Sequence, residues 1–282
     1  MKGLRAALAA CACWLASAAL AQERVDVPSL EQRGGAAVLL SADWFTAQGS
    51  GARPAIVMLH GCGGAFDVRG RLSARMREYA ALFNTEGWHS LVLDSLTARG
   101  ERELCTQKIG TRRITQAQRR LDALGALQWL AARGDVDAKR MALVGWSNGG
   151  STVLAATNRR QREVAAAGVS PRVAVAFYPG CDAELARGHD TTAPLLLLVG
   201  ASDDWTPAAP CIALAERGGP SLRSVVYPGA FHGFDGTAPL RVRREVPGGV
   251  NPGQGVTVGG DAAAREGSQR EMLGHLRAHL AR

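Results

Sequence analysis

The five residues GWSNG at positions 145–149 place a serine where it could act as a nucleophile. They follow the apolar run 141–144, which we expect to be a strand, and precede the small-residue stretch 150–156, which we expect to be a helix. Between a strand and a helix, the pattern G-x-S-x-G holds its serine in a strained turn with the hydroxyl exposed. A side chain two positions to either side would collide with the neighbouring elements, so both positions are glycine. We therefore expect Ser147 to attack a substrate carbonyl.

A serine hydroxyl is a weak nucleophile near neutral pH, so it needs a base and a carboxylate that orients the base. Downstream of Ser147, Asp203 and Asp204 follow an apolar run, and His232 follows the next one. The order Ser, acid, His is that of one large class of catalytic triads. We assign Asp203 as the acid, because a Gly-x-x-Asp loop with proline four residues later is usual for that role. Asp204 is the alternative, and otherwise caps or braces the loop.

The oxyanion formed on the attacked carbonyl needs two preorganised donors. We expect one to be the backbone N–H of Asn148, which follows the nucleophile. The other should come from the segment HGCGG at residues 60–64, directly after an apolar run, and we assign it to the N–H of Cys62. The glycines there allow the backbone to approach the substrate. We expect His60 to be structural, bonding within its own loop.

Two tryptophans lie next to the catalytic candidates in the sequence. Trp146 and Trp205 are candidates for the lining of an apolar substrate pocket, with ordinary core packing as the alternative.

The other polar residues that could bind a ligand or a metal are expected to be structural. Asp94 is expected to orient a loop. No cluster has the spacing of metal ligands, so we predict neither a metal nor a cofactor. The remaining histidines are expected to be surface or packing residues: His89, His189, His275 and His279.

The elements that must position these residues alternate short apolar runs with longer amphipathic stretches. Near-continuous apolar strands between helices indicate an α/β fold, with a mostly parallel sheet covered on both faces. Active sites in such sheets form at the carboxyl ends of the strands, where the candidates lie. The Gly- and Pro-rich residues 236–260 are expected to be a surface loop or insert. Expected strands are 36–40, 55–59, 90–93, 141–144, 173–177, 195–199 and 224–227, and expected helices are 72–83, 111–132 and 262–280.

The first 21 residues have the composition of a secretory signal peptide. Lys2 and Arg5 precede an apolar stretch, and Ala19 to Ala21 gives the small-x-small pattern of a cleavage site. The stretch is too short for a membrane span, so we expect no stable membrane insertion. Lipoprotein processing at Cys11 is the alternative. We therefore expect a secreted or periplasmic protein with one domain over residues 22–282.

Four of the six cysteines lie beyond the expected signal peptide. An even number in an oxidising compartment favours disulfides, although the sequence permits three pairings. We favour Cys62 with Cys105 and Cys181 with Cys211, because each pair would join loops at the same edge of the sheet. Buried free thiols are the alternative.

The charge of the chain gives little indication of a macromolecular partner. The formal net charge is +8, and loss of the two basic residues of the signal peptide lowers it to +6. The arginines are scattered through the sequence, which favours a solvated surface over a nucleic-acid site. We expect a small-molecule partner and predict no oligomeric state.

The motifs together resemble the dienelactone hydrolase family of α/β-hydrolases, and its secreted members in particular. The resemblance spans roughly residues 35–281. It implies an α/β-hydrolase fold without a large lid domain, acting as a hydrolase of esters or lactones. The matching segments are HGCGG at 60–64, GWSNGG at 145–150, DDWTP at 203–207 and YPGAFHGFD at 227–235.

Two departures from the family pattern bear on the substrate. The founding members have a cysteine at the position of Ser147 and a glutamate in the loop that here begins with His60. This chain has neither, so we expect a serine esterase that cleaves carboxylic esters through an acyl-enzyme. A serine peptidase or acyltransferase is the alternative enzyme, and a non-catalytic binding protein of the same fold is the alternative without catalysis.

Overall fold

The computed structural model describes residues 21–281. Of the predicted signal peptide only Ala21 belongs to the described residues, so the signal and the alternative processing site at Cys11 lie outside them. Among the described residues, no helix is both long enough and apolar enough to cross a membrane.

An eight-stranded sheet forms the centre of the molecule, in the order β1-β2-β4-β3-β5-β6-β7-β8. The strands from β3 to β8 pair in parallel, whereas β1 and β2 form an antiparallel edge. The carboxyl ends of the six parallel strands therefore meet at one edge of the sheet. The strands are β1 (Ala21–Arg33), β2 (Ala36–Thr46), β3 (Arg53–Leu59), β4 (His89–Leu93), β5 (Val136–Trp146), β6 (Val173–Phe177), β7 (Leu195–Gly200) and β8 (Leu222–Tyr227).

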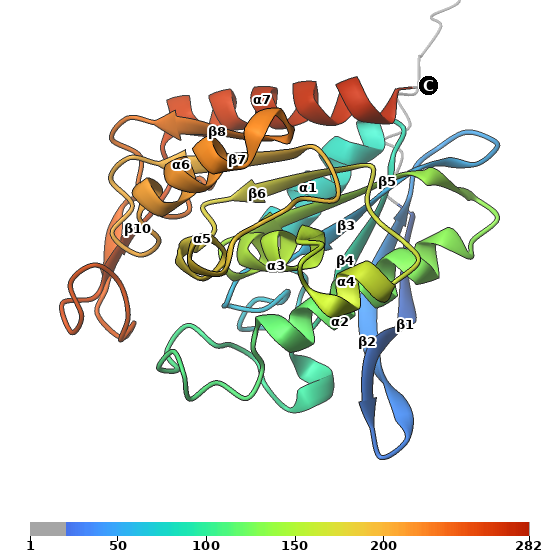
Figure 1. The fold of residues 1–282 in the computed structure, drawn as a ribbon, viewed down its shortest axis with the longest axis horizontal. Coiled ribbons are helices and arrows are strands. Elements are labelled where there is room, and N and C mark those ends of the chain that lie inside the picture. The colour runs from blue at the N-terminus through green and yellow to red at the C-terminus, as the bar shows by residue number, and fades with distance from the viewer. Residues whose placement is uncertain (1–20, 282) are drawn as a thin grey trace, which may run out of the picture.

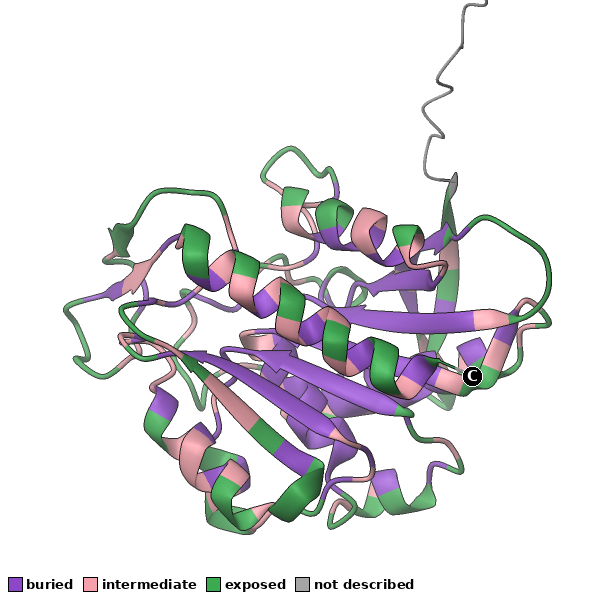
Figure 2. Cartoon of the chain, turned by 90° about the horizontal axis from the view of Figure 1, so that it is seen from above, coloured by how far each residue is buried: buried purple, intermediate pink, exposed green. Residues whose placement is uncertain are grey.

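Helices cover both faces of this sheet (Figures 1 and 2). Successive side chains of a strand point to opposite faces, and β7 shows the consequence. Leu195 and Leu197 pack in the core cluster with α2, α3 and α6, whereas Leu196 and Leu198 pack in the cluster with α1 and α7. The helices are α1 (Ala74–Thr85), α2 (Gln116–Ala131), α3 (Asn148–Thr157), α4 (Arg162–Ala166), α5 (Asp182–Arg187), α6 (Ala208–Arg217) and α7 (Ala262–Leu280), with short 3-10 turns η1 (Thr97–Arg99) and η2 (Gly219–Ser221).

The structure corrects several predicted boundaries. The sequence analysis missed β1, a largely polar edge strand that buries few side chains, Val27 among them. The predicted helix 111–132 begins only at Gln116, because Thr115 and Gln118 form a capping box there. The predicted loop or insert at 236–260 contains a two-stranded ribbon, β9 (Arg241–Arg243) and β10 (Val256–Val258).

Candidate active site

The structure brings Ser147, His232 and Asp203 together at the carboxyl edge of the sheet. The Ser147 Oγ lies 2.9 Å from the His232 Nε2, and the His232 Nδ1 lies 2.8 Å from the Asp203 Oδ2. Ser147 follows β5, Asp203 follows β7 and His232 follows β8. His232 and Asp203 are each 4% exposed. Three residues far apart in the sequence thus form one continuous hydrogen-bonded chain.

The turn that carries Ser147 is strained and closely packed. Ser147 has φ 54° and ψ −116°, a conformation that L-residues rarely adopt. A Cβ on Gly145 would lie 2.2 Å from the carbonyl oxygen of Gly149, and one on Gly149 would lie 1.9 Å from that of Leu59. The steric reason given for the two glycines therefore holds in this structure, and the turn presents the hydroxyl to His232.

The two neighbouring aspartates, Asp203 and Asp204, have different hydrogen-bond partners. Asp203 Oδ1 accepts the backbone N–H groups of Trp205 and Thr206 at 2.9 and 2.8 Å, whereas Oδ2 bonds to His232 and also accepts the Thr206 hydroxyl at 3.0 Å. Burial alone would raise the pKa of Asp203, but the adjacent imidazole and these donors outweigh it and hold the pKa below its ordinary value. Asp204 instead accepts the N–H and the hydroxyl of Thr257, each at 2.8 Å. It therefore braces the β9–β10 ribbon.

The two expected oxyanion donors lie in the segments that flank Ser147. A Cβ on Gly61 would lie 3.5 Å from the Cβ of Ser147, so the 60–64 loop passes beside the nucleophile. Asn148 begins α3, where a backbone N–H has no partner within the helix. Within the described part of the chain, the N–H of Cys62 has no protein acceptor either. Both groups are thus free to bind a substrate oxygen.

Disulfides join Cys62 to Cys105 and Cys181 to Cys211, the pairing that the sequence analysis favoured. The first attaches the 60–64 loop to the long segment that precedes α2. The Leu104 N–H also donates to the Cys62 carbonyl at 2.7 Å. Cys62 is therefore fixed through both its side chain and its backbone.

Arg119, which the sequence analysis missed, connects the two segments that carry the expected oxyanion donors. Its guanidinium donates to the Asn148 Oδ1 at 2.5 Å and to the His60 carbonyl at 2.8 Å. The residue is 1% exposed, and it makes no ion pair with a described residue. Burial lowers the pKa of Arg119 to about 10, so the group stays protonated at neutral pH. A buried positive charge therefore lies behind the proposed oxyanion site.

Comparisons with known proteins identify the family and the fold. Residues 41–280 match the model of the dienelactone hydrolase family. The chain belongs to the dienelactone hydrolase family. The predictions of this family and of an α/β-hydrolase fold are confirmed.

Solved structures of this family share the fold at low sequence identity. A dienelactone hydrolase from Anabaena variabilis is 20% identical with a TM-score of 0.63, over 92% of this chain and 99% of that one. A dienelactone hydrolase-like promiscuous phosphotriesterase from metagenomic libraries is 20% identical with a TM-score of 0.64, over 92% and 99%. An ethyl acetate hydrolase from Pseudomonas putida is 45% identical over 71 residues, which are 23% of this chain and 21% of that protein. These 71 residues are thus a small part of that relative.

Two clefts meet at Ser147 in this dienelactone hydrolase family member. The larger, of about 750 Å³, is also lined by His232, Trp205 and Arg75. The smaller, of about 300 Å³, is lined by Ser147, Asn148 and Trp205 among others. A substrate centred on Ser147 could therefore extend to either side.

The two tryptophans differ in their environments. Trp205 lines both clefts, and its ring centroid lies 4.6 Å from that of His232. Trp146 is 1% exposed, and its indole Nε1 donates to the Asp235 Oδ2 at 3.0 Å. Trp205 thus fits the predicted pocket role, whereas the side chain of Trp146 fits the alternative of core packing.

Asp235 is a second buried residue that the sequence analysis did not select. Its carboxylate accepts the Tyr178 hydroxyl at 2.6 Å and the Arg75 Nε at 3.1 Å, in addition to the Trp146 indole. The Tyr178 ring lies 4.6 Å from that of His232. Asp235 therefore ties the nucleophile strand and the histidine loop to α1.

His60 and Asp94 have structural environments. The His60 Nδ1 lies 2.7 Å from the Gly61 carbonyl oxygen, and its Nε2 accepts the Ser95 N–H at 3.2 Å. Burial lowers the pKa of His60 to about 3, so the ring is neutral. Asp94 accepts the N–H groups of Leu96 and Thr97 at the start of η1.

Over residues 21–281, no group of three His, Cys, Asp or Glu side chains is arranged so that it could hold a metal ion.

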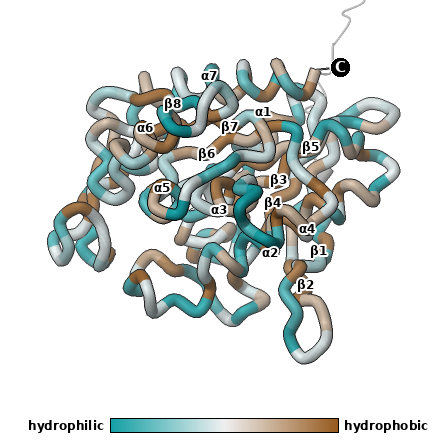
Figure 3. Tube along the Cα trace, viewed as in Figure 1, coloured by the Kyte–Doolittle hydropathy of each residue, from teal (hydrophilic) through white to brown (hydrophobic). Residues whose placement is uncertain are grey.

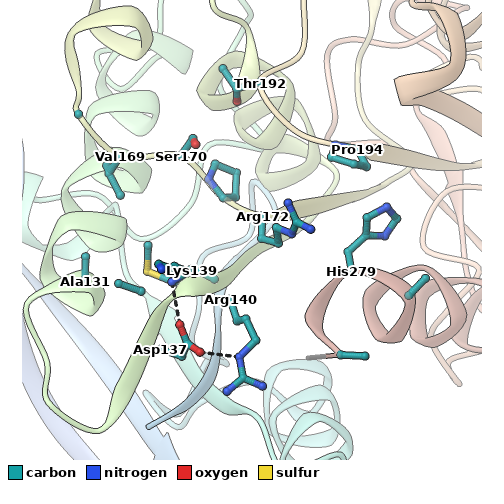
Figure 4. A pocket seen from close by; sticks show the side chains of 16 residues that line it. Ala131, Asp137, Lys139, Arg140, Val169, Ser170, Arg172, Thr192, Pro194 and His279 are labelled. Atoms are coloured by element: carbon teal, nitrogen blue, oxygen red, sulfur yellow. Dashed lines mark hydrogen bonds and ion pairs between the residues drawn. The ribbon is translucent and has the colours of Figure 1, made fainter.

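A third hollow lies at the opposite edge of the sheet, at the amino ends of β6 and β7 (Figure 4). It has about 1100 Å³ and contains no triad residue. Asp137 there accepts the Lys139 N–H and the Arg140 Nε at 2.9 and 2.7 Å. Lys139 and Arg172 are exposed. This groove has no buried nucleophile or base, so it is not the candidate active site.

Proposed function

We propose that the protein is a serine hydrolase that cleaves carboxylic esters through an acyl-enzyme on Ser147. The observation that carries the proposal is the hydrogen-bonded chain from Ser147 through His232 to Asp203. Such a chain gives a weak nucleophile the base and the orienting carboxylate that it needs. The 71-residue match to an ethyl acetate hydrolase supports an ester substrate.

In the first half of the reaction, the Ser147 Oγ attacks the ester carbonyl while its proton passes to the His232 Nε2. Asp203 holds the His232 Nδ1–H and stabilises the imidazolium that forms. The N–H groups of Cys62 and Asn148 bind the oxyanion, with the charge of Arg119 behind them. His232 then protonates the leaving alcohol, and the acyl group remains on Ser147.

In the second half, His232 removes a proton from water, which attacks the acyl-enzyme. The tetrahedral intermediate collapses, the carboxylic acid leaves, and the proton returns to Ser147. The two clefts that meet at Ser147 give separate places for the acyl and alcohol parts of the ester. The chain has no glutamate in the 60–64 loop, so we propose simple esters ahead of lactones.

The proposal extends to the compartment and the domain. Two disulfides and the signal-like residues 1–21 support a secreted or periplasmic protein. Residues 22–282 would then be the mature single domain.

Labelling and turnover by a Ser147→Ala variant test the proposal. A fluorophosphonate probe should label the wild type at Ser147, and the variant should be folded, unlabelled and inactive on short p-nitrophenyl esters. Ser170→Ala, at the opposite edge of the sheet, is the matched control and should behave as the wild type. Labelling at another residue, or undiminished turnover by Ser147→Ala, would contradict the mechanism. Faster cleavage of p-nitroanilides than of esters would favour a peptidase, and transfer to added alcohols would favour an acyltransferase.

A further inference from the structure

Three exposed segments surround the clefts that meet at Ser147, and we call them the mouth segments: residues 66–71, 101–113 and 239–250. Each contributes residues to the walls of a cleft that also contains Ser147. The β9–β10 ribbon projects on the left of Figure 1, and the 101–113 segment projects at the lower left. Among the residues of these segments that line the clefts are Asp67, Ile109, Arg112, Arg241 and Arg243.

Large apolar side chains are exposed mainly on these segments. Val68 is 98% exposed and Ile109 is 72% exposed, and Leu240, Val242 and Val250 are each more than half exposed. The remaining exposed large apolar residues of the described chain are Leu39 and Val226, on β2 and β8. Figure 3 shows apolar segments interspersed with polar ones along the projecting loops. Exposed apolar side chains on segments that line a cleft are typical of an interaction surface.

The net positive charge of the protein also gathers at the mouth segments. They contain nine Lys or Arg residues and four Asp or Glu residues, a formal net charge of +5, and the chain from Gln22 onward carries +6. The carboxylates already have partners: Asp67 pairs with Arg71, Glu101 with Arg113 and Glu245 with Arg243, and Glu103 accepts from Thr106. Across residues 21–281, no ion pair involves Arg69, Arg102, Lys108, Arg241 or Arg244. These five cations are available to a negatively charged partner.

We propose that the mouth segments bind the surface of anionic lipid aggregates and hold the clefts against it. An anionic surface attracts clustered basic residues, and apolar side chains between them enter the boundary between headgroups and acyl chains. This is adsorption to a surface and requires no membrane-spanning element. It goes beyond the proposed function, because it concerns where the enzyme meets its ester and not how it cleaves it.

Two other partners fit the same residues less well. A single-stranded nucleic acid is typically bound by aromatic side chains that stack on bases, a duplex is bound through its phosphates, and neither would account for exposed large apolar residues that are all aliphatic in the described chain. A second copy of the chain would bring two surfaces of the same positive charge together, and like charges repel. A lipid surface offers acyl chains to the aliphatic side chains and anionic headgroups to the cations.

Vesicle sedimentation of the full mature chain tests the inference. The Ser147→Ala variant is used so that no lipid is hydrolysed, which also makes the result independent of the proposed function. We expect at least about 10-fold tighter binding to vesicles containing phosphatidylglycerol than to pure phosphatidylcholine vesicles, and a loss of binding at high salt. Absence of binding, or equal binding to both vesicles, would overturn the inference.

Two variants and two matched controls separate the apolar and the charged contributions. Val68→Ser/Val242→Ser/Val250→Ser and Arg69→Glu/Arg102→Glu/Arg244→Glu should each weaken vesicle binding by about 10-fold or more. In the background with Ser147, the apolar variant should keep the wild-type rate on soluble p-nitrophenyl acetate. The controls Leu39→Ser/Val226→Ser and Lys139→Glu/Arg172→Glu/Arg217→Glu should bind as the parent does.

Three further outcomes would overturn the inference. Equal losses of vesicle binding in the control variants would show that overall hydropathy or net charge, and not the mouth segments, governs binding. Binding to heparin or DNA without binding to vesicles would indicate a polyanion site. If the protein does not bind vesicles but self-associates, and the apolar variant abolishes the self-association, the mouth segments would be a dimer interface.

Discussion

Both edges of the sheet have a cleft or groove, but only the carboxyl edge brings together buried groups that could act as nucleophile, base and acid. At the amino edge, the groove of Figure 4 is larger than either cleft at Ser147, but its cations Lys139 and Arg172 are exposed. At the carboxyl edge, the clefts are smaller, but the residues beside them are buried and bonded to one another, as Asp203 and His232 are. Exposed charges are screened by water, whereas the interactions of buried charges with their neighbours are screened much less. Convergent buried polar groups are therefore a better reason to propose the active site here than the size of a hollow would be.

The largest expected effect comes from removing the charge of Asp203. Asp203→Asn should keep the fold and lower kcat on p-nitrophenyl acetate by about 10⁴-fold, because the amide no longer holds the His232 tautomer that accepts the Ser147 proton. Steady-state kinetics measures this. Asp137→Asn, at the amino edge, is the control and should leave kcat unchanged. An equal loss in the control would remove the functional distinction between the two edges.

The next effect distinguishes the two disulfides. Replacing either pair by serines should lower the free energy of unfolding by about 4 kcal/mol, from the loop-closure entropy. Only Cys62→Ser/Cys105→Ser should also lower kcat at a temperature where both variants are folded, because Cys62 carries a proposed oxyanion donor. Denaturant titration and kinetics on the two variants check this. Equal activity of both would show that the bond does not position the donor.

A smaller effect is expected from Arg119. Arg119→Met should lower kcat by about 10²-fold with little change in KM, since it removes the charge and the hydrogen bonds behind the oxyanion site. Arg119→Lys should restore part of the activity, because it keeps the charge. A change confined to the melting temperature, with kcat intact, would reduce Arg119 to a structural role.

The smallest effect is the pH dependence of stability, and it again separates the two edges. Burial lowers the pKa of His60 to about 3, whereas the unfolded chain takes up that proton near the ordinary value of 6.5. The unfolded state therefore binds more protons as the pH falls below the ordinary value, and stability falls until the pH passes below the folded pKa. His60 alone should lower the unfolding free energy by about 2 kcal/mol between about pH 8 and about pH 5.

His275, near the amino edge, provides the comparison. Burial lowers its pKa to about 4, so its contribution has the same sign over a narrower pH window. His60→Gln should flatten the acid limb of a urea-derived stability profile more than His275→Gln does. The reverse order would contradict the assignment of His60 as the more deeply buried neutral ring.

The local motifs of the chain made much of the site predictable. The G-x-S-x-G turn has a steric requirement that can be read within five residues, and Asp203 and His232 each follow an apolar strand. The Asp203 and Asp204 pair could be ordered from the loop pattern, and the structure separates them by their partners. Strand β1 was missed because an edge strand needs only one paired side and tolerates polar residues on most positions.

The tertiary structure alone decided three other features. Arg119 lies on α2 beside Arg120, and nothing in the helical pattern indicates which of them reaches Asn148 and His60. Asp235 follows His232 by three residues, yet its partners come from α1, β5 and the end of β6. The arginines are scattered in the sequence, yet most of the net charge gathers at the mouth.

The family, the fold and the order of the proposed triad could all be predicted from the sequence, because each depends on short segments whose backbone requirements are local. Only the tertiary structure determined the buried supports of the site and the charge around its entrance. Those features arise from contacts between segments tens of residues apart, and a linear pattern of residue types does not encode which side chains meet.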